Sequence, residues 1–298
     1  MATFTPVDLS QLPAPEVVEV LDFEDILASM LSDLRARMPE FDALVESDPA
    51  YKILEVAAYR ELLIRQRVND AAKSVMLAYA GGTDLEQLGA LFGVSRLLVD
   101  AGDDTAIPPV PPTYEGDAEL RRRIQLSLEA LAAAGPVKAY QYHALSADPD
   151  VLDASAVSVS PGEVIVAVLS RDGNGAASDS LVAAVEAALS PEDVRPLSDY
   201  VVVEAAAIQT YSVSATLYFN SGPDRSVVLA QAQKAIEEYT AGQHRIGRDV
   251  TLSGIYAALH QPGVSRVSLA SPSGTISVDK RSASYCSSIT LTDGGVDA

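Results

Sequence analysis

The feature that most constrains this sequence is a run from Ala50 to Ala80 that contains neither glycine nor proline. Asp48-Pro49 precedes the run as an N-cap with a first-turn proline, and Gly81-Gly82 follows it, which predicts a single long helix. A helix of about thirty residues is roughly 45 Å long. Its apolar residues surround most of the cylinder instead of forming one stripe, so it needs more than one packing partner. Those partners lie either within its own domain or in another subunit.

An amphipathic helix is predicted before this run, opening at Pro15-Glu16 and ending before Pro39. Apolar residues recur there at three- and four-residue spacing, which is typical of a helix with one buried face. The stretch before it, residues 1–15, contains three prolines and no periodicity. We expect that stretch to be an extended arm that can lie on a neighbouring chain.

Shorter elements follow the long helix. Thr83-Asp84 is expected to cap a short helix closed by Gly93, and the proline-rich segment 97–113 is expected to be a loop, a hinge or an excursion. Asp117 begins another helix, with an inner stripe of Leu120, Ile124, Leu128 and Leu131 and with three outward arginines, Arg121, Arg122 and Arg123. The arginines form either a solvated helix face or a docking patch for acidic residues of a neighbouring chain.

Beyond Val137 the pattern changes to alternating strands and helices. The apolar run 164–169 predicts a central strand, and strict alternation over 211–219 predicts a half-buried antiparallel strand. We therefore expect an α+β fold in which an N-terminal helical, bundle-forming region precedes two small strand–helix–strand α/β units. The expected domains are an arm over 1–15, a helical domain over 16–136 with the proline-rich loop 97–113, a first α/β unit over 137–207, and a second over 208–298 that includes a C-terminal edge strand with a frayed tail.

Charge and hydropathy exclude several classes of partner. The 298 residues carry 41 Asp and Glu against 21 Lys and Arg, a formal charge of −20. Phosphate backbones and anionic membranes are repelled by such a charge, so we expect no nucleic-acid partner. No signal-peptide pattern and no long uncharged apolar stretch occurs, which argues against secretion and membrane insertion. The lone Cys286 cannot form an internal disulfide, which favours a reducing cytoplasm as the site of synthesis.

Motifs that carry catalysis are almost absent. His143, His244 and His260 are the only histidines, and no zinc, calcium, P-loop or nucleophile-elbow spacing occurs. An acidic cluster contains Asp148, Asp150 and Asp153 but has no closing glutamate that could complete a metal site. We interpret the cluster as a solvated helix end. We expect no metal, no cofactor and no enzymatic activity.

One segment is a candidate ligand site. The glycine-rich loop 170–178 lies between an apolar strand and a helix, where backbone N–H groups can cradle a phosphate. It lacks a third glycine and a lysine, and Asp172 and Asp179 would repel an anion. A tight connection with positive φ at Gly173 and Gly175 explains the loop equally well. A small-ligand or phosphate-binding enzyme that uses this loop is the alternative to a purely structural protein.

Several separate segments resemble the baseplate J-like family of contractile phage tails. They are AYAGGTDLEQLGALFGVSR, Gly116-Asp117 followed by ELRRRI, AAAGPVKAYQYHALSADPDV and GRDVTLSGIYAALHQPGV. The resemblance extends in order over nearly the whole chain, including the arm and the stretch PGEVIVAVLSRDGNG. It implies a structural part of the baseplate wedge, from a phage or from a phage-tail-like bacteriocin, with no motif of catalytic residues.

The resemblance also implies partners and location. Proteins of this family join a second wedge protein through helices, with two copies combining with one chain of that partner. Copies link neighbouring wedges into a ring around the central hub and spike, which rearranges when the sheath contracts, and a sheath-initiating baseplate protein is a further neighbour. Assembly in the bacterial host cytoplasm and residence in the tail baseplate follow. A receptor-binding tail tip is disfavoured because only 6% of residues are aromatic and Trp is absent.

These expectations select candidate interface residues. The helices between Val17 and Leu77 are expected to enter a bundle shared with the second wedge protein, and the α/β units after Val137 to pair between wedges. The candidates are Phe23, Ile26, Leu27, Met30, Ile53, Val56, Leu63, Ile64, Val68, Arg121, Arg122 and Arg123.

Overall fold

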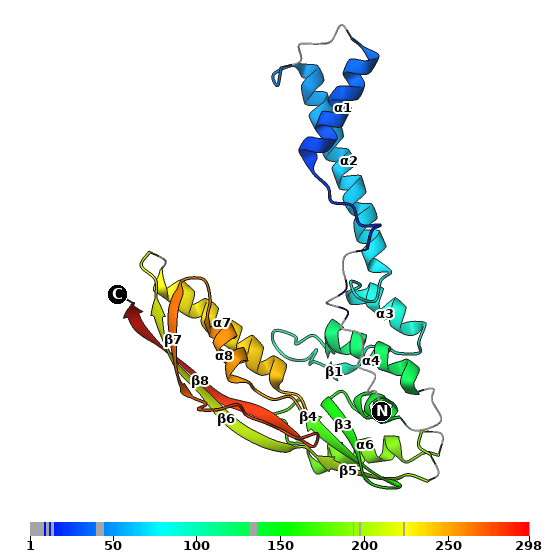
Figure 1. Cartoon of the computed structure of the whole chain (residues 1–298). Coiled ribbons are helices and arrows are strands. Elements are labelled where there is room, and N and C mark those ends of the chain that lie inside the picture. Colours follow the sequence, from blue (N-terminus) through cyan, green and yellow to red (C-terminus); the bar gives the residue numbers. More distant parts are fainter. Residues whose placement is uncertain are drawn as a thin grey trace. The chain divides into compact units, whose positions relative to one another are not determined.

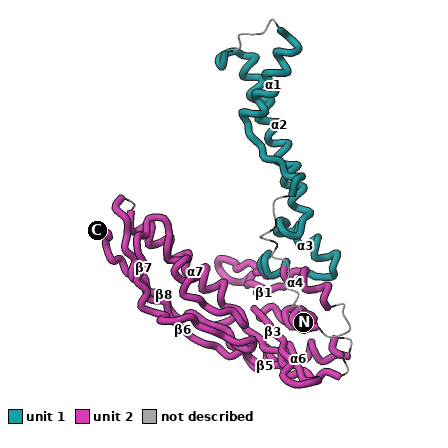
Figure 2. The backbone as a smooth tube through the Cα atoms, in the orientation of Figure 1, with its two compact units in different colours: residues 1–95, 116–121 teal, residues 96–115, 122–298 magenta. Residues whose placement is uncertain are grey.

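The computed structural model describes residues 9, 12, 15–39, 45–130, 136–192, 194–196, 198–222 and 224–297. Most of the expected N-terminal arm, together with Leu131, lies outside the described residues. The chain divides into two compact units (Figure 2). Unit 1 comprises residues 1–95 and 116–121, and unit 2 comprises residues 96–115 and 122–298.

Unit 1 is helical, as expected. Helix α1 (Phe23–Arg37) and helix α2 (Pro49–Ser74) run in opposite directions side by side (Figure 1). Helix α1 begins later than the apolar spacing predicted, because the Asp22 carboxylate accepts hydrogen bonds from the backbone N–H groups of Glu24 at 2.7 Å and Asp25 at 3.2 Å. That side-chain cap fixes the first turn at residue 23.

Helix α2 begins at its predicted cap but ends early. The Asp48 carboxylate accepts a 2.8 Å hydrogen bond from the Ala50 N–H, with Pro49 in the first turn. The helix stops at Ser74 instead of Ala80. Arg121 donates to the carbonyls of Leu77 at 2.7 Å and Ala80 at 2.6 Å, so these carbonyls are satisfied by a side chain from elsewhere in unit 1 instead of by a continuing helix.

Helix α3 (Gly82–Ala90) closes near Gly93, which has the positive φ of +69° expected of a helix-ending glycine. The predicted Thr83-Asp84 cap is wrong. Gly81 is the N-cap without a side-chain hydrogen bond, and the Gly82 N–H donates instead to the Asp117 carboxylate at 3.0 Å.

In unit 2, the segment expected to be a loop contains a short antiparallel hairpin of β1 (Leu98–Asp100) and β2 (Thr113–Tyr114). Helix α4 (Asp117–Ala130) begins where the sequence placed it, with Leu120 and Ile124 buried as expected, but Leu128 of the expected inner stripe is 58% exposed. The bounds of helix α5 (Val137–Ala147) were not predicted, but its C-cap Asp148 lies at a helix end, as expected for the first of the three aspartates. Its buried residues, Ala139, Tyr140, Ala144 and Leu145, pack over the first sheet.

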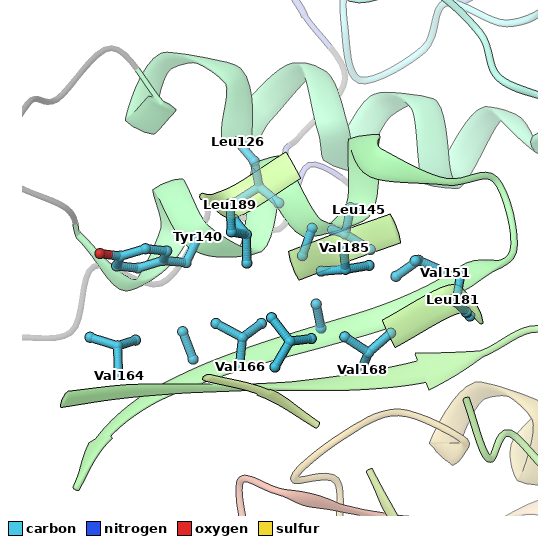
Figure 3. Packing of buried hydrophobic residues seen from close by; sticks show 14 residues of the cluster. Leu126, Tyr140, Leu145, Val151, Val164, Val166, Val168, Leu181, Val185 and Leu189 are labelled. Atoms are coloured by element: carbon cyan, nitrogen blue, oxygen red, sulfur yellow. The ribbon is translucent and has the colours of Figure 1, made fainter. Parts of the chain in front are cut away.

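That sheet has the strand order β3-β4-β5, from β3 (Val151–Ser160), β4 (Glu163–Ser170) and β5 (Tyr200–Ala205). Strands β3 and β4 are antiparallel, and β4 and β5 are parallel because helix α6 (Asp179–Leu189) connects them. Figure 3 shows the core between this sheet and the helices on one of its faces, with Val166 and Val168 opposite Val185 and Leu189.

The second sheet has the order β7-β6-β8, from β7 (Val264–Ser271), β6 (Ala207–Phe219) and β8 (Ser282–Val296). Helices α7 (Arg225–Gln243) and α8 (Leu252–Leu259) pack with it through a core that includes Leu217, Ile236 and Ile255. Helix α8 is capped by the Thr251 hydroxyl, which accepts from the Gly254 N–H at 3.1 Å. The terminal strand is at the sheet edge as predicted, but its end is held by a 3.0 Å hydrogen bond from the Asp297 N–H to the Phe219 carbonyl and so is not frayed there.

The two sheets of unit 2 share a nearly continuous strand. Strand β5 ends at Ala205 and β6 begins at Ala207. The Ala206 N–H still donates to Val168 of the first sheet, while the Ala207 N–H donates to Arg281 beside the second.

Helical and mixed-sheet regions follow one another along the chain, which confirms the α+β class.

Candidate partner-binding surface

One face of α2 is apolar and exposed. We define the outer stripe as Ile53, Val56, Leu63, Ile64 and Val68, whose exposed fractions lie between 41% and 69%. Each residue turns about 100° around a helix, so these five lie on one side. The opposite side faces α1 through the fully buried Ala58 and through Leu54 and Leu62. Helix α2 therefore has one occupied and one unoccupied apolar face among the described residues.

The candidates on α1 lie behind this surface. Ile26 and Leu27 are buried against α2, and Phe23 and Met30 pack partly buried around them. These four residues hold the helical hairpin together and support the outer stripe. Periodicity identified them as one apolar face but did not indicate that α2 of the same chain would cover it.

A buried asparagine that the sequence reasoning missed fixes the chain entering α1. The Asn69 side chain is 4% exposed, accepts from the Glu19 N–H at 3.0 Å and donates to the Glu19 carbonyl at 2.9 Å. Arg65 pairs with Glu61, four residues earlier, at 2.6 Å and with Glu19 at 3.4 Å. The sequence could have indicated these hydrogen bonds between Asn69 and the Glu19 backbone, because Asn69 is a polar residue on the α1-facing side of α2.

The prediction that the three arginines face outward is wrong. Arg121 donates to the two carbonyls beyond α2, as described above. Arg123 is buried with Glu115 at 2.8 Å, the two side chains being 7% and 3% exposed. Arg122 donates to Asp153 at 2.7 Å. A helical pattern gives the direction of a side chain but not the neighbour that it meets, so the internal acceptors were not foreseen.

Asp153 is likewise not part of a solvated helix end. Its carboxylate is nearly buried and accepts from Arg122 of α4 and, at 3.0 Å, from the N–H of Ile246. Ile246 lies between α7 and α8 and forms an isolated β-bridge with Ala283 of β8, so one carboxylate joins the first sheet to the segment that follows α7. The alternation of strand residues did not show that this aspartate points inward.

The glycine-rich loop is a tight connection. Gly173 and Gly175 have φ values of +60° and +93°. Backbone hydrogen bonds close the loop on itself: the Ser170 N–H donates to the Gly175 carbonyl at 2.8 Å and the Gly175 N–H to the Asp172 carbonyl at 3.0 Å. A Cβ on Gly175 would lie 2.8 Å from the Nε2 atom of His244. Close packing and turn geometry therefore account for the glycines without a ligand.

The three histidines, the remaining candidates for a catalytic or metal site, lie on different helices. His244 and His260 end helices α7 and α8, and His143 lies within α5 against Tyr142. Over the described residues, no three His, Cys, Asp or Glu side chains are grouped so that they could hold a metal ion. The helices described there are also too short or too polar to cross a membrane.

A second exposed apolar surface lies on the β1–β2 hairpin. Leu98, Val110 and Tyr114 are about half exposed and Ile107 is 99% exposed. The hairpin is nonetheless ordered, since Asp103 and Val110 exchange backbone hydrogen bonds of 2.8 and 2.9 Å. The proline spacing had suggested an irregular loop and gave no indication of this pairing.

Comparisons with known proteins identify the family. The baseplate J-like N-terminal domain matches residues 46–103, the central domain residues 132–205 and the C-terminal domain residues 211–292. "Baseplate protein J" of Escherichia phage P2 is 49% identical over 98% of this chain and 99% of its own length. The cryo-EM structure of the anti-feeding prophage baseplate matches with a TM-score of 0.38 and 13% identity, over 62% of this chain and 45% of that chain. The exposed helical face and the α+β fold thus occur in a chain that belongs to the baseplate J-like family.

Proposed function

We propose that this chain is a structural subunit of a contractile-tail baseplate that joins a second wedge protein through the outer stripe of α2. The observation that carries the proposal is that stripe, together with a relative named as a baseplate protein over almost its whole length. Monomeric soluble proteins rarely expose a contiguous large apolar surface without a binding role. Burying one such side chain contributes about 1.5–3 kcal/mol, so five adjacent ones supply a substantial driving force for association.

The α/β units are assigned a second contact, between copies of this chain. We propose that they pair with copies in neighbouring wedges and so close a ring around the central hub. Strand β8 is at the edge of its sheet and contains neither lysine nor proline, the residues that commonly protect an edge strand from pairing. Two copies with one chain of the wedge partner, contact with a sheath-initiating protein, rearrangement on contraction and assembly in the host cytoplasm are further parts of this proposal.

A structural role is favoured over an enzymatic one. The backbone N–H groups of Ser170, Asp172, Gly175 and Ala176 are engaged within the glycine-rich loop, and Gly175 lies directly against His244. A phosphate cradle needs such donors to be free.

The test replaces Leu63 and Ile64 by aspartate in the full chain. Both side chains are exposed, at 41% and 66%, so the chain itself should remain folded by circular dichroism. When the variant is co-expressed with the products of neighbouring tail genes, co-purification of the wedge partner should be lost, because two carboxylates would have to enter an apolar interface.

The matched control is the double variant Leu128→Asp and Val227→Asp, which adds the same charge at residues 58% and 53% exposed outside unit 1. It should co-purify the partner like the natural chain. Retention of the partner by the Leu63 and Ile64 variant would contradict the assignment of the outer stripe.

A further inference from the structure

Two arginines lie in the middle of the outer stripe. Arg60 and Arg67 are both exposed and are seven residues apart on α2. Seven residues complete almost two turns, so the Cα atoms of the two arginines lie nearly on one line, about 10.5 Å apart along the helix. They are within about 60° of Ile53 and Ile64 around the axis. A partner that covers the apolar stripe must therefore also cover both charges.

No acidic residue in the part of the chain that the structure describes pairs with these two charges. Within the described residues, neither Arg60 nor Arg67 forms an ion pair, whereas Arg65 on the α1-facing side pairs with Glu61 at 2.6 Å. The other acidic residues of α2 are engaged elsewhere on the helix. Glu55 pairs with Lys52 at 2.8 Å, and Asp70 accepts from Gln66 at 2.7 Å. Among the described residues the outer stripe thus presents two positive charges without an acidic partner, in a chain whose formal charge is −20.

Burial of a guanidinium without a carboxylate is strongly unfavourable, because the lost hydration is not replaced. A second copy of this stripe cannot supply the carboxylates, since it would bring arginines against arginines. A second helix can pack along the outer stripe, because its residues also return to the same face about every seven positions.

From this geometry we propose that the outer stripe binds an amphipathic helix of a different chain, and that the apolar face of that helix carries two carboxylates seven residues apart. Each carboxylate pairs with one of Arg60 and Arg67, which sets the register between the helices. The inference rests on the proposed function and adds the chemistry by which the partner is recognised.

The experiment compares Arg60→Leu/Arg67→Leu with the natural chain, each co-expressed with the products of neighbouring tail genes. The dissociation constant is then measured for the tail protein that co-purifies with the natural chain. Leaving two partner carboxylates buried without a cation should weaken binding at least ~10-fold for each arginine. Arg60→Lys/Arg67→Lys, which keeps the charges, should bind more tightly than the leucine variant. The control Arg65→Leu, off the stripe, should bind like the natural chain.

The sign of the effect decides the proposal. If the partner had no carboxylates opposite the arginines, leucine would extend the apolar stripe and the variant would bind as tightly as the natural chain or more tightly. That result would overturn this inference while the proposed function stands. Absence of any complex with the natural chain would instead overturn the proposed function, and the inference with it.

Discussion

Replacement of Asp153 by alanine should destabilise unit 2 strongly, because this carboxylate accepts from the neighbouring Ala154 N–H and from two donors in distant parts of the sequence. It accepts from Arg122 at 2.7 Å and from the Ile246 N–H at 3.0 Å while its own side chain is only 5% exposed. A hydrogen bond to a charged group contributes about 1.5–3 kcal/mol, and a buried donor left without an acceptor costs about 1–3 kcal/mol.

The Arg122 side chain is 37% exposed, so water partly replaces its lost partner. The hydrogen bond between Arg122 and Asp153 should therefore contribute near the lower end of the range for a charged group, about 1.5 kcal/mol. We therefore expect Asp153→Ala to lower the free energy of unfolding by about 3 kcal/mol. Asp150→Ala is the matched control. Burial and the nearby Asp148 and Asp172 raise the pKa of Asp150, which means that its charged form is disfavoured in the folded chain and its removal should be neutral or slightly stabilising.

Urea unfolding followed by far-ultraviolet circular dichroism measures the loss. Because two units can unfold separately, hydrogen exchange of peptides that contain Ile246 should be measured alongside and should accelerate only in Asp153→Ala. A stability within about 0.5 kcal/mol of the natural chain, a change typical of a surface substitution, would refute the bridging role of Asp153.

Three further changes test other parts of the structure. Asn69→Ala should lower the stability of unit 1 by about 1–3 kcal/mol through loss of the clamp on Glu19, and chemical denaturation of the full chain should show it. Gly175→Ala should reduce expression and thermal stability more than Gly173→Ala, because both have positive φ but only Gly175 lies against His244; equal effects in a thermal melt would contradict this. Cys286 should react slowly with a thiol reagent at pH 8, because burial raises its pKa and so lowers the thiolate fraction, and rapid labelling of the folded chain would show that the thiol is accessible and ionised.

Local signals in the sequence were sufficient where a structure depends on neighbouring residues. The Asp48-Pro49 pair identified the start of α2, and the alternation over 211–219 identified the core strand of the second sheet, whose residues Val213, Leu217 and Phe219 are buried. The positive φ at Gly173 and Gly175 also followed from the tight connection that their spacing indicated.

Features that depend on distant residues could not be predicted in this way. The segment after the end of α2 depends on Arg121, more than forty residues away, which donates to the carbonyls of Leu77 and Ala80. The inward direction of Asp153 depends on Arg122 and Ile246, and the hairpin within 97–113 depends on the pairing of Asp103 with Val110. In each case the sequence contains the residues but not the contact that gives them their role.

The candidate surface shows the same division. Periodicity indicated that α2 has more apolar surface than one partner can cover, and the exposed outer stripe agrees with that reading. It could not separate the face used within the chain, around Ala58, from the face left exposed, around Ile64, because both are apolar.

The central claim is that this chain is an assembly subunit whose exposed helical face binds another protein. The most direct test is to co-express the full chain with the products of neighbouring tail genes and to measure the mass and stoichiometry of the purified material by light scattering behind a sizing column. A discrete hetero-complex that contains more than one copy of this chain is the predicted result. A well-behaved monomer that binds none of the tail proteins would contradict the claim.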